Sequence, residues 1–156
     1  MNIVVLNRSD WLDERNVRLV DRRADHIRSV LRAAVGDSIR VGELNGDLGQ
    51  GRICALDADA VVLEVDLNQP PPPRHRFDIV LALPRPKVLR RLFRTVAEYG
   101  VANLHLINCA RVEKSYWQSP LLAPEKVHDA LLAGMERASD TVAPRVHQHR
   151  RFRPFV

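Results

Sequence analysis

Cysteine is scarce in this chain of 156 residues: only Cys54 and Cys109 are present, far apart in the sequence. Neither belongs to a Cys-x-x-Cys pair or has histidines at the spacing of zinc ligands, so the sequence predicts neither a disulfide framework nor a metal site. We expect both thiols to stay reduced and to pack as small apolar side chains in the core.

Long apolar runs and catalytic signature motifs are also missing. No window of about 18 apolar residues could span a bilayer, and no charged start precedes an apolar signal run. We therefore expect a soluble, cytoplasmic protein. The sequence has no Gly-x-Gly-x-x-Gly, no P-loop, no Gly-x-Ser-x-Gly and no paired-carboxylate pattern. Composition and spacing alone therefore name no reaction.

Positive charge is abundant but unevenly distributed. Residues 1–70 contain nine Arg and twelve acidic residues, a net charge of −3, whereas residues 71–156 contain fifteen basic and seven acidic residues, a net charge of +8. A strongly basic second half predicts a phosphate-bearing partner, with nucleic acid as the first choice.

Four consecutive prolines interrupt the chain within the stretch NQPPPPRHR, residues 68–76. Proline has no amide donor and favours the extended polyproline II conformation, which makes a stiff spacer. We predict a first domain over residues 1–69, a linker over 70–76 and a second domain over 77–156.

The first domain is predicted to be a small, mostly antiparallel barrel that carries one helix. Its β-rich runs, residues 38–41, 49–57 and 60–67, are typical of a meander, and residues 2–7 add a strand. The helix is expected within residues 21–37. Asp21 is its expected N-cap and Gly36 its expected stop. Its expected apolar side is formed by Ile27, Val30, Leu31 and Ala34.

The second domain alternates strands and helices. Residues 77–83 form a continuous apolar run of the buried parallel type, a helix follows over about 86–99, and the next strand spans 103–108. A second helix begins at Pro124, and a third strand is expected around 144–146. Three strands and two helices make an incomplete doubly wound sheet, so either a partner chain completes the fold or the sequence is part of a longer protein.

The helix over residues 86–99 has a one-sided basic face. A projection at 100° per residue places its cations opposite its apolar residues. A solvated polar face is the ordinary interpretation, but such faces mix both signs, and this helix has one acid, Glu98. Bound phosphates would relieve the repulsion between these cations. The cations are Lys87, Arg90, Arg91 and Arg94; the apolar side is Val88, Leu89, Leu92, Val96 and Tyr99, with Phe93 at its margin.

Two further groups of residues suit a nucleic acid. In the first domain, Arg28 and Arg32 lie one turn apart, and the planar guanidinium of Arg matches phosphate. His26 lies at the margin of the same helix, where a position between core and solvent is the alternative. The loop over 111–120 follows a strand and combines Arg111, Lys114, Tyr116 and Trp117, a mixture that suits an unpaired nucleotide. Trp117 could equally anchor this loop onto the sheet.

Four segments together resemble the small-subunit ribosomal RNA methyltransferase E family, which methylates N3 of a uridine with S-adenosylmethionine. The resemblance covers the whole chain. HIRSVLRAAVGD (26–37) is similar to an N-terminal motif of the family, and VLALPRPKVLRRLFRTVAEYGV (80–101) is similar to its strand, basic helix and turn. INCARVEKSYW (107–117) and GMERASDTVAPRV (134–146) resemble the segments that follow.

The resemblance implies a PUA-like RNA-binding barrel followed by the first part of a SPOUT-type α/β methyltransferase domain, which is knotted and homodimeric in the family. S-adenosylmethionine would be the cofactor, and ribosomal RNA or the small ribosomal subunit the substrate. The family's cofactor loops contain Gly-Pro-Glu-Gly-Gly and Leu-Arg-x-Glu-Thr, and neither occurs here, so no cofactor-binding residue is assigned. In segment 134–146 only Glu136 matches cleanly, because Arg137 and Asp140 replace the family's usual Gln and Arg.

The same resemblance implies RNA contacts in both domains. The charge pattern of the sequence predicts two further RNA contacts, Lys114 and Arg94. The N3 proton of uracil has a pKa well above neutral, so catalysis must stabilise the developing anion, and Arg111 is the candidate catalytic residue. Glu98 matches a carboxylate of the family, with pairing to Arg94 and a catalytic role both open. The expected RNA-binding residues are His26, Arg28, Arg32, Arg85, Lys87, Arg90, Arg94 and Lys114.

Three functions remain in view. The first is the rRNA methyltransferase, with this chain carrying mainly its RNA-binding part. The second is a non-catalytic RNA-binding module that lacks the cofactor site. The third is a different α/β nucleotide binder, which the lack of a Gly-rich phosphate loop disfavours.

Overall fold

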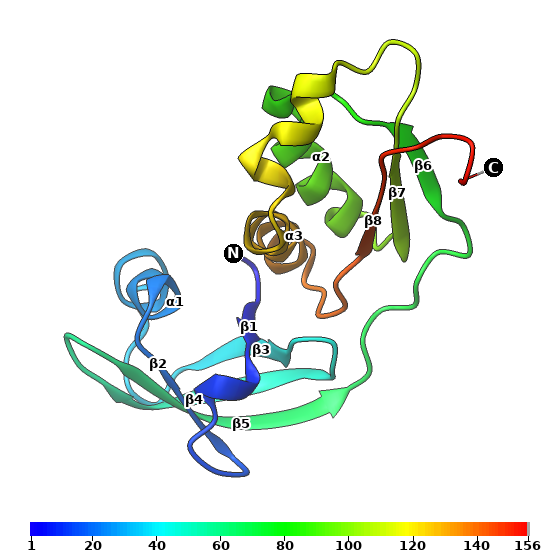
Figure 1. Cartoon of the computed structure of the whole chain (residues 1–156). Coiled ribbons are helices and arrows are strands. Elements are labelled where there is room, and N and C mark those ends of the chain that lie inside the picture. The colour runs from blue at the N-terminus through cyan, green and yellow to red at the C-terminus, as the bar shows by residue number, and fades with distance from the viewer. Residues whose placement is uncertain (156) are drawn as a thin grey trace. The chain divides into compact units, whose positions relative to one another are not determined.

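The chain divides at its run of prolines into two units, Met1–Pro71 and Pro72–Val156. The computed structural model describes residues 1–155 (Figure 1). The division falls inside the stretch for which the sequence predicts a linker. Among residues 1–155, no helix has both the length and the apolar composition needed to cross a bilayer.

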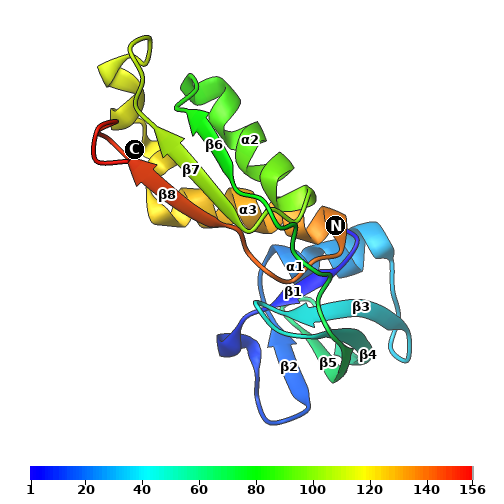
Figure 2. The same cartoon turned by 90° about the vertical axis from the view of Figure 1, so that its right-hand side faces the viewer.

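The first unit is built on a five-stranded sheet with the order β1-β3-β4-β5-β2. β1 pairs with β3 in parallel, and the other neighbours are antiparallel. The sequence predicted the strands of this sheet except β2. Among the described residues β1 and β2 are the two edges of the sheet and do not pair with each other. The sheet is therefore curved but not closed into the predicted barrel (Figure 2). The strands are β1 (Val4–Leu6), β2 (Asn16–Leu19), β3 (Ser38–Glu43), β4 (Leu48–Leu56) and β5 (Val61–Gln69).

The core of the first unit lies on one face of this sheet. Alternation along β5 buries Val61, Leu63 and Val65 on that face, as expected for a sheet with one wet side. The bulge in β4 at Gly49 needs glycine, because a Cβ there would overlap the carbonyl oxygen of Asp66. Cys54 is exposed on β4, so its predicted place in the core is wrong.

The helix of the first unit is shorter than predicted. α1 (Arg22–His26) continues as a π-helical turn, η2 (Ile27–Leu31), and ends where Arg32 adopts a left-handed conformation with φ of 52°. The predicted N-cap is confirmed, since the Asp21 side chain accepts from the Arg23 amide at 2.9 Å. A π-turn rotates the following residues away from the 100° spacing. Of the predicted apolar side only Ile27 is buried, while Val30, Leu31 and Ala34 are exposed.

A buried ion cluster ties this helix to the sheet. The Arg23 side chain is only 5% exposed, and its Nη1 and Nη2 donate to both carboxylate oxygens of Asp10 at 2.6 and 2.8 Å. It also donates to the Val5 carbonyl at 2.8 Å and to Asp21. Burial lowers the pKa of Arg23, but the hydrogen bonds that it donates to the carboxylates of Asp10 and Asp21 outweigh burial and leave that pKa raised.

The second unit is a three-stranded parallel sheet in the order β6-β7-β8, with two helices on one face (Figure 2). This confirms the predicted alternation of strands and helices. The strands and helices are β6 (Ile79–Ala82), α2 (Pro86–Glu98), β7 (Asn103–Ile107), α3 (Pro124–Ala138) and β8 (Arg145–His149). Two short helical turns, η3 (Lys114–Gln118) and η4 (Pro120–Leu122), lie between β7 and α3, and a third, η1 (Arg8–Asp10), belongs to the first unit.

Strand β6 is not the fully buried strand that its apolar run predicts. Its residues alternate between half-buried and exposed, and Val80 is 49% exposed. β6 is an edge strand, and the helices cover only one face of the sheet. An apolar run therefore identified the strand but not its burial.

The two helices pack closely through Gly134 of α3. A Cβ at this position would overlap the carbonyl oxygen of Arg94 on α2. Phe93, expected at the margin of the apolar side of α2, is almost fully buried, whereas Tyr99, expected within it, is 68% exposed. Gly100 follows with φ of 62° and ends the helix as predicted.

Candidate RNA-binding surface and adjoining cavity

The cations of α2 form an exposed surface, which we call the α2 basic face. All of its members are exposed, and within residues 1–155 none of them forms an ion pair. Proline at the first helical position and the buried residues Leu89, Phe93 and Val96 fix the orientation of the helix. The members are Lys87, Arg90, Arg91 and Arg94. Arg85, the N-cap residue just before the helix, is likewise exposed and has no ion pair within residues 1–155.

The single acid of α2 does not neutralise this face. Glu98 Oε1 lies 3.6 Å from Nη1 of Arg137 on α3, so its partner is Arg137 and not Arg94. The pairing of Glu98 with Arg94 considered from the sequence is therefore not the one observed. Arg94 is left available for an anion.

A cavity of about 880 Å³ opens at the carboxyl ends of β7 and β8. This is the edge at which open α/β sheets place their ligands. Two cations line the cavity. Lys114 is one of the residues that the sequence predicted to bind RNA, and Arg150 is not. The lining residues are Asn108, Cys109, Ala110, Val112, Lys114, Trp117, Gln118, Arg150 and Phe152.

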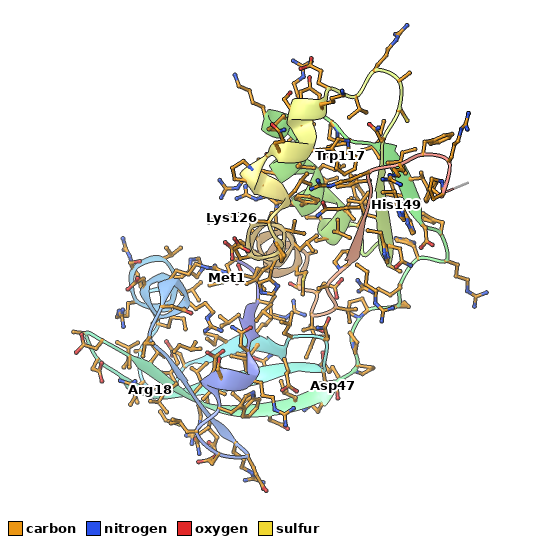
Figure 3. All side chains as sticks on the ribbon, in the orientation of Figure 1. Met1, Arg18, Asp47, Trp117, Lys126 and His149 are labelled. Carbon is orange, nitrogen blue, oxygen red and sulfur yellow. The ribbon has the colours of Figure 1, made fainter. Side chains whose placement is uncertain are left out.

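Trp117 anchors the loop between β7 and α3 (Figure 3). Its indole is buried and its Nε1 donates to Asn108 Oδ1 at 3.2 Å. The guanidinium of Arg150 lies 5.9 Å from the ring centroid, and its Nη2 donates to the Trp117 carbonyl at 3.4 Å. The anchoring role left open by the sequence is the one observed, and Trp117 joins the loop to the segment after β8.

Arg111, the candidate catalytic residue, lies on the same loop. The structure leaves its side chain exposed in the turn after β7, and it is not among the residues that line the cavity. Lys114 lies at the start of η3 and does line it.

In the first unit the three predicted RNA-binding residues have different surroundings. Arg28 is held in place, because it donates to Asp25 Oδ1 at 2.6 Å and to the Asp57 carbonyl at 3.0 Å. Arg32 is exposed at the end of the π-turn. His26 is half-buried, and its buried Nε2 has no hydrogen-bond partner within residues 1–155.

Residues 70–156 match the RNA methyltransferase domain family. The chain belongs to this family. It is also 34% identical over 125 residues to the ribosomal RNA small subunit methyltransferase E of Treponema pallidum, an alignment that covers 80% of this chain and 47% of that protein. The chain thus spans about half the length of this curated relative. The resemblance found in the sequence is confirmed.

Solved structures share the fold. A predicted RNA methyltransferase from Thermotoga maritima has a TM-score of 0.70 at 17% identity, covering 97% of this chain and 66% of its own. A probable rRNA-methyltransferase from Porphyromonas gingivalis also has a TM-score of 0.70, at 21% identity, covering 94% of this chain and 60% of its own. A ribosomal RNA small subunit methyltransferase E from Neisseria gonorrhoeae, bound to S-adenosyl methionine, has a TM-score of 0.68 at 14% identity, covering 95% and 62%.

Within this RNA methyltransferase domain, Asp140 has a clear structural role. Its buried carboxylate accepts from Arg74 Nη2 at 2.5 Å, and Arg74 Nη1 donates to the Val142 carbonyl at 3.2 Å. The departure from the family pattern at Asp140 therefore supplies the counter-charge for Arg74. This pair holds the end of the Pro-rich stretch on the second unit.

Sequence reasoning missed a row of histidines on the uncovered face of the parallel sheet. The ring centroid of His105 lies 4.5 Å from that of His147 and 5.2 Å from that of His149. His105 Nδ1 is 3.0 Å from His149 Nε2. Residues 147 and 149 alternate along β8, and His105 is opposite His147 in the register. Strand alternation was the available signal, but the register between β7 and β8 was not readable from the sequence.

Proposed function

We propose that this chain carries mainly the RNA-binding part of an enzyme that methylates N3 of a uridine in small-subunit (16S) ribosomal RNA with S-adenosylmethionine. The observation that carries the proposal is the unpaired α2 basic face within an RNA methyltransferase domain. The relative from Treponema pallidum supports the choice of small-subunit rRNA. We further propose that the protein acts in the cytoplasm and as a homodimer.

The α2 basic face would bind the phosphate backbone. Its cations lie along one side of a helix whose other side is fixed to the core, so their spacing is preset. Each phosphate that they neutralise releases condensed counterions, which makes binding favourable and salt-dependent.

The lining of the cavity at the ends of β7 and β8, within residues 1–155, does not by itself fit the sulfonium and ribose groups of the methyl donor. S-adenosylmethionine carries a sulfonium cation and ribose hydroxyls, groups that carboxylates bind well. The cavity at the ends of β7 and β8 has enough room, but its charged lining residues within residues 1–155 are Lys114 and Arg150, both cations. No catalytic step is therefore assigned through the donor, and the cavity suits an anionic group of the RNA better.

For the reacting base, we assign the anion-stabilising role to Arg111. Removal of the N3 proton leaves negative charge on the uracil ring, and a nearby guanidinium lowers the energy of that anion. The exposed position of Arg111 on the loop beside the cavity leaves its side chain accessible to an RNA base.

Fluorescence anisotropy with labelled small-subunit rRNA fragments tests the RNA-binding part of this proposal. We expect binding that weakens steeply as salt is raised. Absent binding, or binding insensitive to salt, would contradict it. Light scattering tests the homodimer, and a monomer at all concentrations would overturn that part.

The non-catalytic RNA-binding module is the second candidate. The cationic lining of the cavity favours it. Calorimetric titration of S-adenosylmethionine into a version of the protein extended past residue 156 separates the two candidates. Heat of binding at one site supports the enzyme, whereas RNA binding without any such heat supports the module.

A further inference from the structure

A second, smaller cavity lies between α2, α3 and η4. Its volume is about 240 Å³, below the roughly 300 Å³ at which pockets begin to take drug-sized ligands, so it suits one small unit of a polymer. Phe93 and Ala130 are buried and form its apolar floor, and Leu121 of η4 adds a wall. The remaining lining residues are Arg90, Lys126 and Asp129.

The charges around this cavity are not used by the fold. Arg90 comes from the α2 basic face, and Lys126 lies in the first turn of α3, where the helix dipole adds positive potential (Figure 3). Within residues 1–155 neither cation forms an ion pair, and Asp129 accepts no hydrogen bond there. Arg90, Lys126 and Asp129 are thus exposed charges around an apolar floor, and their charged groups have no partner within residues 1–155.

We propose that this cavity binds one ribose-phosphate unit of RNA. Arg90 and Lys126 bind the phosphate, the sugar lies against Phe93 and Leu121, and Asp129 accepts a hydrogen bond from the ribose 2′-hydroxyl. The assignment rests on the proposed RNA-binding function and extends it to two residues, Lys126 and Asp129, outside the α2 basic face.

Asp129 is the residue that identifies the ligand. A site for phosphate alone would gain nothing from a carboxylate, because the two anions repel each other. A neighbouring hydroxyl donor turns that carboxylate into a charge-assisted acceptor. The 2′-hydroxyl is the group by which proteins distinguish RNA from DNA, so the cavity acts as an RNA-selective contact.

The test compares single-stranded RNA and DNA of one sequence by fluorescence anisotropy over a range of salt concentrations. For Lys126→Ala we expect the slope of log K against log salt to become shallower by about 0.7, the value for one lost phosphate contact on a single strand. For Asp129→Ala we expect the preference for RNA over DNA to fall by about tenfold. Arg145→Ala, which removes an exposed cation from β8, is the charge-matched control and should change neither quantity.

The possible failures are distinguishable. If the wild-type chain binds no RNA, the proposed function fails. If it binds RNA but Lys126→Ala and Asp129→Ala keep the wild-type slope and RNA preference, this inference alone is overturned. Should a variant unfold, titration of the wild-type chain with ribose 5-phosphate and 2-deoxyribose 5-phosphate decides the matter: amide shifts at Lys126 and Asp129 should respond more strongly to the ribose compound, and equal responses would refute the assignment.

Discussion

Two groups of arginines, one in each unit of this chain, differ in whether they have carboxylate partners. In the first unit Arg23, Arg28 and Arg52 are each paired with a carboxylate. In the second unit the α2 basic face has no carboxylate partner within residues 1–155. A count of cations therefore says little about RNA binding until their partners are known. Free cations mark the surface that an RNA can use, and paired cations stabilise the fold.

Arg23 provides the largest test of this contrast. Replacement of Arg23 by Met leaves Asp10 buried without its counter-charge, so we expect a loss of about 3 to 5 kcal/mol in the free energy of unfolding. Urea titration followed by circular dichroism measures it. Arg52→Ala is the matched control, because its pair with Glu64 is solvent-exposed and its loss should barely change the free energy of unfolding. Equal losses in both variants would contradict the distinction.

Gly134→Ala tests whether close helix packing holds the α2 basic face in place. The added methyl group would overlap the Arg94 carbonyl oxygen, so α2 must move, at an expected cost of about 1 to 3 kcal/mol. Thermal unfolding gives the stability, and RNA affinity should fall as well because the cations shift. Ala133→Ser, one position earlier on α3, controls for a change on that helix, and a Gly134→Ala variant as stable as the wild type would exclude the close packing.

Arg91→Ala sharpens the comparison within the second unit. Arg91 is exposed and unpaired, so its removal should leave thermal stability unchanged and weaken RNA binding by about 1 kcal/mol at moderate salt. Anisotropy and melting curves of one sample give both quantities. A clear loss of stability with unchanged RNA affinity would assign Arg91 to the fold.

Asp21 should give the smallest effect, on the acid side of the pH range. Burial raises the pKa of Asp21, but hydrogen bonds and charge from Arg23 outweigh it and leave that pKa lowered. Its stabilising contribution is therefore present above the ordinary carboxyl pKa of 3.8 and is lost as pH falls through the lowered value. Because the side chain is half exposed, we expect no more than about 1 kcal/mol. Asp21→Asn should flatten the stability profile below pH 4, and an unchanged profile would contradict this role.

The sequence predicted those features that local chemistry determines. α2 and α3 begin at prolines and show helical periodicity, so their starts were readable. The Asp21 cap and the stop at Gly100 follow from the same rules. In the candidate site, the exposure of Lys87, Arg90, Arg91 and Arg94 was predicted from one helical projection.

The remaining features depend on contacts between distant segments. The π-turn after His26 changes which side chains face the core, and no local pattern in the sequence indicated it. Arg150 reaches the cavity because β8 lies beside β7, a pairing that periodicity does not encode. The partners of Glu98 and Asp140 likewise come from other elements, Arg137 and Arg74. The roles of Arg111 and of the other RNA-binding residues stay predictions.

The salt dependence of RNA binding tests the central claim most directly. It should be measured for the wild-type chain and for a variant in which Lys87, Arg90, Arg91 and Arg94 are all replaced by Ala. We predict a steep slope of log K against log salt for the wild type, shallower in the variant by about 0.7 for each cation lost, with the fold retained in circular dichroism. A folded variant with the wild-type slope would show that the α2 basic face does not bind RNA.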